Sequence, residues 1–324
     1  MKNILVLIII VFLHVTLFGQ SELVQLESVL NKAITRILAD QDLSGGWSRV
    51  KDEFPVESEP TSWAVKVLAL NNVKTEQLKK GVQFILNDQK LDGSWNNNTA
   101  HTAFAVLALR EVGYVGDAIS KALQYFKKVQ LENGGFSRIG TEGDPLSIYT
   151  AVVLCALKEA SVDENTPMVK KAIEWLLSCQ NQDGGFGMTR GIPSLAICTA
   201  WAIKSLMSYG YKPGVDPINK AIRWLLTTQK ESGGFSMTSQ THEDPEVTAY
   251  VILALSPVTE LKERLLLAVD YLSKVQTEDG AFVSDTPIQF KKVPKKNTQT
   301  TCFVAWALSE LRIRLGSLKS NHGK

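Results

Sequence analysis

A short glycine-containing segment that ends in an aromatic residue recurs along the chain, and it constrains the fold more than any other feature. The pattern Gln-x-x-x-Gly-[Gly/Ser/Ala]-[Trp/Phe] returns at intervals of 41 to 50 residues. Its copies begin at Gln41, Gln89, Gln130, Gln180, Gln229 and Gln276. A near-constant period of this length indicates a chain built from repeated supersecondary units.

A helical pattern precedes and follows these segments. Residues 172–180 and 221–229 place apolar side chains at three- and four-residue spacing, which predicts an amphipathic outer helix. The inner segments 102–109, 150–157, 248–255 and 301–308 are apolar on nearly every side, which predicts helices buried all round. Such hairpins must stack on their neighbours, and no polar capping repeat stands at either end. The sequence therefore predicts an all-α fold: a closed α/α toroid (an α6/α6 barrel) of six helical-hairpin repeats, as one domain over residues 22–315.

The recurring turn has a mechanical interpretation. Each glutamine stands at the end of an outer helix, where backbone carbonyls lack partners, and we expect its amide to donate to them. The following glycine is expected to adopt a positive φ that reverses the chain. Because the same feature serves six equivalent joints, we interpret the six glutamines as structural rather than catalytic.

The two ends of the chain differ from the repeats. Residues 4–18 form an apolar run after Lys2, followed by Gly19, which is typical of a secretory signal peptide over residues 1–20. We therefore expect an exported protein, periplasmic or secreted, or one held by an N-terminal membrane anchor if the signal is not cleaved. Residues 316–324 are expected to form a polar C-terminal tail.

The net charge and the cysteine content exclude few classes of function. The formal net charge of +2 gives no argument for a nucleic-acid partner. We expect buried free thiols, although export would permit disulfides and the sequence cannot choose a pairing. The cysteines are Cys155, Cys179, Cys198 and Cys302.

The repeated segments resemble the QW motif of the terpenoid cyclase and protein prenyltransferase superfamily. The resemblance covers nearly the whole chain after the apolar run and implies a squalene–hopene cyclase-like α/α toroid, here a single-toroid exported member. Activity does not follow from the fold, because unrelated activities share it. Triterpene cyclases that resemble this chain use two toroids, whereas the helices predicted here suffice for one.

The resemblance to prenyltransferase β subunits would imply a catalytic zinc held by Asp, Cys and His. Thr300 stands where that His is expected, and the sequence contains no Asp-x-Cys. The Asp-Asp pair of magnesium-dependent terpene synthases and the thioester motif of complement proteins are also absent. We therefore expect no metal and no cofactor.

Residues 244–249 resemble the Asp-x-Asp-Asp-Thr-Ala motif of class II cyclases, with Glu246 in place of the protonating Asp and Val247 in place of the third acid. The resemblance implies Glu246 as the catalytic acid and Asp244 as its partner, since a neighbouring carboxylate or burial can keep an acid protonated. The alternative is that Asp244 simply caps the helix. Asp144, in the similar segment 143–147, is expected to cap the third inner helix in the same way.

The N-termini of the inner helices should meet at one pole of the toroid, here called the mouth, and favour anions there. The candidate binding residues are the bases Arg49, Arg138 and Arg190, together with His101, Tyr149, Trp201 and Tyr250. Lys291, Lys292, Lys295 and Lys296 add a basic loop that is either an anion site or merely solvated. The aromatic residues, with Trp63, Phe104 and Phe303, either line an isoprenoid cavity or belong to the core.

Three functions remain open at this point, and whether the chain is an enzyme is not decided by its sequence. The first is a protein that binds a lipid, isoprenoid or anionic ligand in the cavity or mouth, with no catalytic activity. The second is a proton-initiated isoprenoid cyclase, that is, an intramolecular transferase or isomerase. The third is an extracellular glycan lyase or hydrolase on an α/α toroid. The oligomeric state is not indicated.

Overall fold

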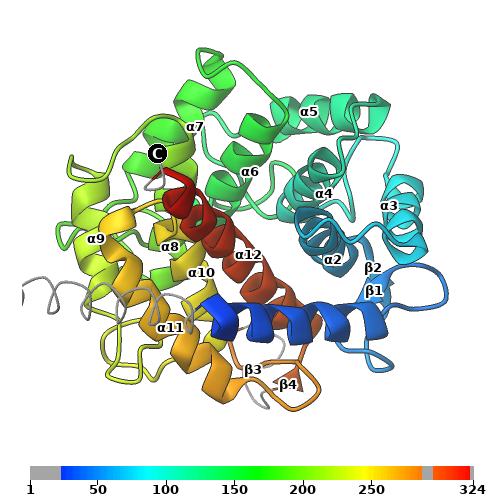
Figure 1. The fold of residues 1–324 in the computed structure, drawn as a ribbon. Helices are drawn as coiled ribbons and strands as arrows, with labels where there is room; N and C mark the ends of the chain where they lie inside the picture. The colour runs from blue at the N-terminus through cyan, green and yellow to red at the C-terminus, as the bar shows by residue number, and fades with distance from the viewer. Residues whose placement is uncertain (1–22, 287–294, 322–324) are drawn as a thin grey trace, which may run out of the picture.

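The computed structural model describes residues 23–286 and 295–321, and its helices form an inner and an outer set (Figure 1). The inner helices are α2 (Ser58–Leu70), α4 (Thr99–Glu111), α6 (Ser147–Glu159), α8 (Ala196–Ser208), α10 (Pro245–Leu255) and α12 (Thr298–Asn321). The outer helices are residues 23–39, α3 (Glu76–Asp88), α5 (Asp117–Val129), α7 (Pro167–Leu177), α9 (Ile218–Leu226) and α11 (Lys262–Val275). A 3-10 turn, η1 (Thr259–Leu261), precedes α11.

Two short antiparallel strand pairs accompany the first and last turns. Strand β1 (Trp47–Ser48) pairs with β2 (Val56–Glu57), with Trp47 opposite Glu57. Strand β3 (Val283–Ser284) pairs with β4 (Lys295–Lys296), with Ser284 opposite Lys295. Both pairs lie where the chain passes from an outer helix to an inner one.

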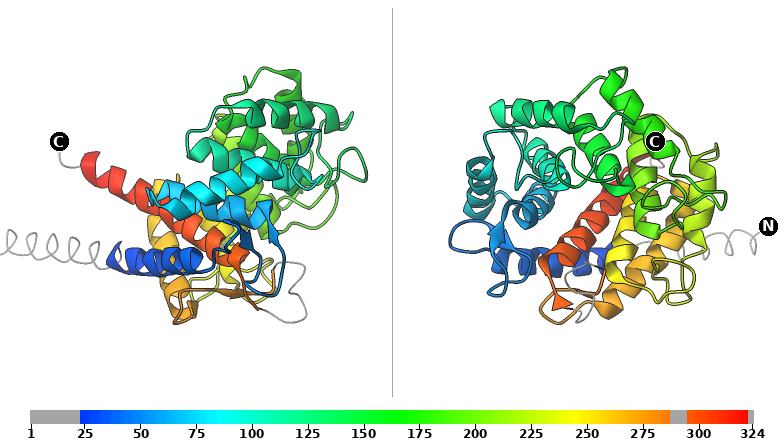
Figure 2. Two further views of the ribbon diagram at one scale, coloured as in Figure 1. Left: turned by 90° about the vertical axis from the view of Figure 1, so that its right-hand side faces the viewer. Right: turned by 180° about the vertical axis from the view of Figure 1, so that it is seen from behind.

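The ring of helices is closed. Each inner helix contacts the next one along the chain, and α12 contacts α2. The outer set closes as well, because the Gln276 amide donates to the carbonyl of Val29 at 3.0 Å and Arg36 forms an ion pair with Asp279. The view from behind in Figure 2 shows the outer helices arranged around the inner ones. The predicted all-α closed toroid of six helical hairpins is confirmed.

Burial separates the two sets as the apolar pattern predicted. Every residue of the inner helix α10 is buried. In the outer helix α3 only Gly81 and Ile85 are buried, and the remaining side chains reach the surface at least in part. An inner helix is packed by neighbours on both sides and by an outer helix behind, so that it has no face left for water.

The two predicted ends lie partly or wholly outside the described residues. The signal peptide expected over residues 1–20 and the basic side chains Lys291 and Lys292 are not among them. Helix α12 continues to Asn321, so the described part of the expected 316–324 tail is helical. Within the described ranges, no helix is both long enough and apolar enough to span a bilayer.

Each repeated glutamine joins its own turn to the next outer helix. The Gln180 Nε2 donates to the Gly184 carbonyl in its turn at 2.9 Å and to the Pro217 carbonyl at the start of α9 at 3.0 Å. The same two bonds are made by Gln41, Gln89, Gln130, Gln229 and Gln276.

The prediction that this amide caps the carbonyls of its own outer helix is therefore wrong. At Gln89, Gln130 and Gln276 the backbone has already left the helix, with ψ near 130°. An extended backbone at this position directs the side chain away from the end of its own helix. The amide consequently reaches the neighbouring repeat, and the bond ties repeats together instead of ending a helix.

The two small residues of the turn have different roles. The first glycine has a positive φ in all six turns, +92° at Gly184, as predicted. It also lies against the next outer helix, since a Cβ at Gly184 would be 2.8 Å from the Lys220 carbonyl. The second glycine, Gly185, makes room for the ring of Trp224, whose Cδ2 would be 2.6 Å from an added Cβ. Both glycines permit close packing between consecutive repeats.

A threonine near the start of each inner helix receives the aromatic residue of the turn. The backbone N–H of Phe186 donates to Thr199 Oγ1 at 2.9 Å, and this hydroxyl in turn donates to the Leu195 carbonyl. Equivalent N–H bonds are accepted by Thr61, Thr102, Thr150, Thr248 and Thr301. These bonds fix the register of each inner helix against its turn and therefore fix which residues face the mouth.

Substitution of the first turn glycine tests the close approach between repeats. Gly184→Ala should lower the free energy of unfolding by about 2–4 kcal/mol, because a left-handed φ and an overpacked contact are added together. Gly113 is a matched control, since its φ is +78° but no atom lies within 4 Å of an added Cβ. Gly113→Ala should cost only about 1 kcal/mol in urea denaturation. Equal losses in the two variants would contradict the packing explanation.

Candidate active site

Residues at the start of the inner helices form two tiers. Glu246 and Gln299 each stand two residues before the threonine of their helix, Thr248 and Thr301. Glu59 has the same place before Thr61 on α2. Aromatic residues stand four positions further along five of the inner helices. This spacing places them on the same helix face as the polar tier: Trp63, Phe104, Trp201, Tyr250 and Phe303. A polar tier at the mouth therefore lies above an aromatic tier one helical turn deeper.

Glu246 is the most completely buried acid of the polar tier, with no exposed surface. Its Oε1 accepts hydrogen bonds from the Tyr250 hydroxyl at 2.8 Å and from the Gln299 Nε2 at 2.6 Å. Its Oε2 accepts from the Thr300 hydroxyl at 2.6 Å. The carboxyl group of α10 is thus held mainly by two residues of α12, the neighbouring inner helix.

Burial raises the pKa of Glu246 to about 7, and the neighbouring charge of Asp244 acts in the same direction. The hydrogen bonds from Thr300, Tyr250 and Gln299 oppose this rise, because they stabilise the charged form. A carboxyl with a pKa near neutrality can hold a proton and also release it, as a general acid requires.

Asp244 is the N-cap of α10, and the capping prediction is confirmed. Its Oδ1 accepts the backbone N–H groups of Glu246 and Val247 at 2.8 and 3.1 Å, and its Oδ2 accepts the Ser284 hydroxyl at 2.7 Å. Burial raises the pKa of Asp244, against these hydrogen bonds. In this capping position Asp244 remains close enough to Glu246 for its negative charge to raise the pKa of Glu246.

The equivalent cap predicted for Asp144 is wrong. Helix α6 begins two residues later than expected, so that Leu146 occupies its N-cap and no side chain caps the helix. The reason is the register set by Thr150: four residues before it stands Leu146, whereas Asp244 stands four residues before Thr248. Aligned on this threonine, segment 143–147 does not match the cyclase motif.

A second polar cluster lies on α2 and α4. Glu59 forms an ion pair with Arg49, and its carboxylate lies 2.9 Å from the Nε2 of His101. Arg49 also approaches Glu57 at 3.5 Å and stands over the Trp63 ring at 5.5 Å from its centroid. The guanidinium predicted to bind an anion is therefore engaged with two carboxylates of its own chain.

The electrostatics of this second cluster differ from those of Glu246. Burial acts most strongly on Glu59 and would raise its pKa, yet His101 and Arg49 together outweigh burial and lower it. Tyr149, in the first turn of α6, is only partly buried. Burial raises its pKa, the charge of Glu59 adds to the rise, and the charges of Arg138 and Arg49 oppose it. The mouth thus holds an ionised acid on α2 and a protonatable acid on α10.

The aromatic tier fills the middle of the ring below the two clusters. Neighbouring centroids among Trp63, Phe104, Trp201, Tyr250 and Phe303 lie 4.7 to 6.4 Å apart. All five rings are buried and belong to the hydrophobic core, as the second of the two alternatives expected. Trp63 Nε1 is buried and has no acceptor in the described part of the chain, an uncommon state for an indole N–H. The rings therefore form an apolar floor beneath the carboxyl groups.

The other predicted bases do not join these clusters. The Nε of Arg190 donates to the Ser178 hydroxyl at 2.6 Å, near the end of α7. Arg138 is exposed and influences Tyr149 only electrostatically. Lys295 pairs with Glu53, and Lys296 pairs with Asp279 at 3.1 Å. Of the three predicted arginines, only Arg49 reaches the polar tier.

The far end of the ring carries a separate set of charges around Trp306. Lys66 and Lys204 stand over this ring at 5.3 and 5.5 Å from its centroid. Lys204 also bonds both carboxylate oxygens of Glu310 at 2.8 and 3.0 Å, and Glu310 accepts the Trp306 indole N–H. These contacts place paired charges at the end of the ring away from the mouth.

The cysteines lie apart from both carboxyl clusters. All four are buried and free, as the sequence analysis expected. Burial raises the pKa of Cys155 and of Cys198 to about 12 and that of Cys179 to about 11, so that these thiols remain protonated at neutral pH. Among the residues that the structure describes, no group of three or more His, Cys, Asp and Glu side chains is arranged to hold a metal ion.

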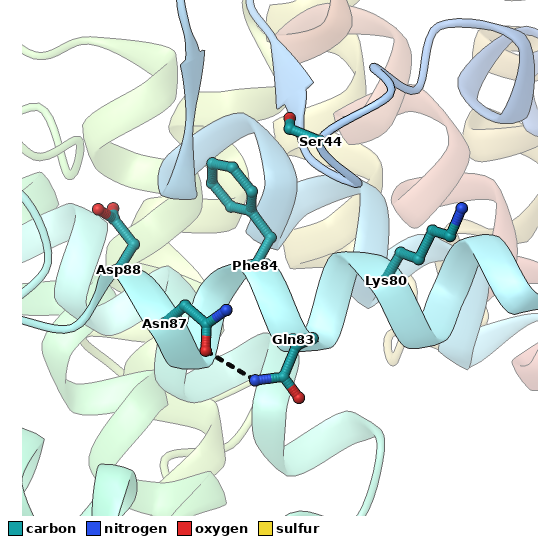
Figure 3. Close-up of a pocket in the computed structure, with 6 residues that line it drawn as sticks. All are labelled: Ser44, Lys80, Gln83, Phe84, Asn87 and Asp88. Carbon is teal, nitrogen blue, oxygen red and sulfur yellow. Dashed lines mark hydrogen bonds between the residues drawn. The ribbon is translucent and has the colours of Figure 1, made fainter.

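A groove on the outside of the ring lies away from this chemistry (Figure 3). It is bounded by Ser44 of the first turn and by one face of α3, where Phe84 points toward the groove. Gln83 and Asn87 bond each other at 2.7 Å along the same helix. None of its lining residues belongs to the polar or aromatic tier, so we place the candidate site at the mouth.

Sequence reasoning missed Gln299 and the pairing of Glu59 with His101. Both were detectable, since Gln299 and Glu59 share with Glu246 the position two residues before the helix threonine. A comparison with the catalytic motifs of cyclases looks for carboxylates, and it therefore overlooks an amide side chain such as that of Gln299. Alignment of the six inner helices on their threonines would have brought the three residues to one position.

The fold defines a class of protein, a closed α/α toroid whose inner helices begin in a polar tier. The model of the prenyltransferase alpha-alpha toroid domain matches residues 7–236 and 196–317, and the chain belongs to that family. A squalene–hopene cyclase of Bradyrhizobium diazoefficiens is 30% identical over 166 residues, 48% of this chain and 24% of the relative. A drimenyl diphosphate synthase of Streptomyces showdoensis is 28% identical over 163 residues, 46% of this chain and 30% of the relative.

The chain thus spans less than a third of these two relatives, but a solved structure matches it end to end. A variant of the type II terpene cyclase MstE from Scytonema, in complex with geranylgeranyl dihydroxybenzoate, superposes with a TM-score of 0.72 at 16% identity. The match covers 91% of this chain and 99% of the neighbour. This likeness shows the fold alone.

The raised pKa of Glu246 predicts a pH-dependent stability. The pKa is about 7 in the folded protein and near its ordinary value of 4.5 when unfolded, so the folded state binds the proton more tightly. The resulting stabilisation is complete below pH 4.5 and is lost as the pH rises through 7, by about 3 kcal/mol. Urea denaturation of wild type and Glu246→Gln between pH 4 and 8 measures it. A difference between the two proteins that is flat with pH would contradict the assignment.

Proposed function

We propose that the chain is a proton-initiated isoprenoid cyclase in which Glu246 is the catalytic acid. The observation that carries the proposal is the environment of this carboxyl, which is fully buried, bonded by three side chains and placed one turn above an aromatic floor. A buried acid with a pKa near 7 is poised for proton transfer at neutral pH. Family membership and the homology to squalene–hopene cyclases support the same class of reaction.

The proposed chemistry begins with the Glu246 proton. The Oε–H bond breaks, and the π electrons of a terminal alkene form a new C–H bond, so that the neighbouring carbon becomes cationic. The electron pair of the broken bond stays on the carboxylate, where Tyr250, Gln299 and Thr300 already donate hydrogen bonds. Further alkenes of the same molecule close the rings, and loss of a proton from the last cation makes the overall reaction an isomerisation.

The aromatic tier would stabilise the cations formed after this step. The faces of Trp, Tyr and Phe rings attract a cation by about 2 kcal/mol each when water is excluded. Trp63, Trp201, Tyr250 and Phe303 supply four such rings below the acid. A lipid or isoprenoid ligand is therefore the partner that we propose for this site.

A second candidate is a protein that binds such a ligand without reaction. It is favoured by Val247, which stands where the third acid of the motif would be, and by the close mutual packing of the aromatic rings. The anionic-ligand version of this hypothesis would use Arg138, because Arg49, Lys295 and Lys296 are already paired with carboxylates of the chain. Binding without turnover in the assay below would support this candidate.

Export is also proposed, on the sequence of residues 1–20 alone. The apolar run after Lys2 has the length and flanks of a signal peptide. Fractionation of the producing cells, with mass determination of the N-terminus, would separate a cleaved secreted form from an anchored one.

Removal of the acid tests the proposed reaction. Glu246→Gln should reduce cyclisation of squalene or of a linear polyprenyl substrate by about 10²–10⁴-fold, because the amide cannot release a proton. Gas chromatography with mass spectrometry of the extracted products is the measurement. Glu231→Gln, at an exposed acid of the fifth turn, is the matched control and should leave the rate unchanged. Wild-type activity in Glu246→Gln would overturn the assignment, and release of sugars from a polysaccharide would favour the glycan-active alternative.

The rate should also depend on pH with a defined sign. Only the protonated form of Glu246 can start the reaction, so turnover should be constant below pH 6 and fall as the pH rises through about 7. A profile of rate against pH at saturating substrate checks this. A rate that increases over the same interval would indicate a base and contradict the role of Glu246 as acid.

A further inference from the structure

Three side chains stand at one position on three consecutive inner helices. Glu246 on α10, Gln299 on α12 and Glu59 on α2 all lie two residues before the threonine that receives the turn. Because α12 contacts both α10 and α2, Gln299 lies between the two carboxylates. Its amide bonds Glu246 directly and reaches Glu59 through Arg49.

Arg49 determines how the Gln299 amide is oriented. The Nη1 of Arg49 donates to Gln299 Oε1 at 3.3 Å, and a guanidinium has donors but no acceptor. A flipped amide would place its NH₂ group against the guanidinium and its carbonyl against the Glu246 carboxyl. Arg49 is itself fixed by Glu59, by Glu57 and by the Trp63 ring. The Gln299 side chain is therefore held in the orientation in which its NH₂ group donates to Glu246.

This orientation makes the two oxygens of Glu246 unequal. Oε1 receives the Gln299 amide and the Tyr250 hydroxyl, which occupy both of its lone pairs. Oε2 has a single partner, the Thr300 hydroxyl. A hydroxyl can rotate to accept a proton or to turn away from it, whereas an amide NH₂ group can only donate.

We propose that Gln299 and Arg49 are positioning residues that place the acid proton of Glu246 on Oε2, beside Thr300. The inference rests on the proposed function of Glu246 as the acid. Oε1 then acts as the carbonyl oxygen of the protonated group, and Oε2–H is the bond that breaks toward the substrate. When the proton leaves Oε2, the Gln299 amide and the Tyr250 hydroxyl already bond Oε1, and the Thr300 hydroxyl only has to rotate to donate to Oε2, so the arrangement stabilises the charged product of the first step.

Infrared spectroscopy of the purified full chain tests this directly, without any substrate. The difference between wild type and Glu246→Gln isolates the carbonyl band of the protonated Glu246 and its disappearance through about pH 7. Gln299→Leu removes one donor from Oε1, so the band should move to higher wavenumber. Its titration midpoint should rise by about one pH unit, since the lost hydrogen bond stabilised the charged form.

Arg49 variants separate positioning from a merely structural role. Arg49→Leu frees the Gln299 amide and should shift the band in the same direction, and Arg49→Lys, which keeps a donor-only group, should restore the wild-type frequency. Gln240→Leu, at an exposed glutamine, is the control and should shift nothing. Circular dichroism checks that each variant is folded, and Gln299→Asn replaces Gln299→Leu if the latter does not fold.

The outcomes distinguish this inference from the proposed function. A Glu246 band that is present in wild type but unshifted in folded Gln299→Leu would overturn the positioning role and leave the acid in place. The absence of any Glu246-dependent band below pH 7 would overturn both. A shifted band with no cyclase activity on any linear polyprene would support the positioning and contradict the proposed reaction.

Discussion

The architecture depends on one hydrogen-bonded joint, the amide of the repeated glutamine shared between two repeats. It bonds the carbonyl of its own turn and a carbonyl at the start of the next outer helix. A helical hairpin of this kind cannot bury its apolar helix alone, so the contact between repeats is what makes the fold stable. The sixth joint, from Gln276 to Val29, closes the outer set of helices, while the contact between α12 and α2 closes the inner set.

Closure of the ring explains why the candidate catalytic residues lie at one end of it. The threonine of each inner helix fixes the helix register against its turn, so residues at one sequence position meet at one level of the ring. Position-equivalent residues then become neighbours although they are far apart in the chain, as Glu246 and Gln299 are. The repeat therefore supplies a scaffold with six equivalent places, and the residues at those places can differ without disturbing the joints.

The fold was predictable from the sequence because its determinants are local and repeated. Gly184 and its five counterparts have the positive φ that the turn requires, and the apolar inner segments are buried helices. The partner of the glutamine was not predictable, because the direction of its side chain depends on one ψ angle beyond the helix end. Asp144 was misplaced for a related reason, since Pro and Asp signal a helix start but the threonine decides which residue is the N-cap.

The candidate site was only half predictable, and the reason lies in the difference between glutamate and aspartate. Asp244 and Glu246 were expected from the motif, with Glu246 as the acid and Asp244 as its partner or as the helix cap, but the contacts of Glu246 with the neighbouring helix were not expected. The short side chain of Asp244 folds back to the first N–H groups of α10 and caps the helix. The extra methylene of Glu246 carries its carboxyl across to Gln299 and Thr300 on the neighbouring helix, where burial can raise its pKa. An acid of this kind is created by contacts between helices, and those contacts exist only once the ring has closed.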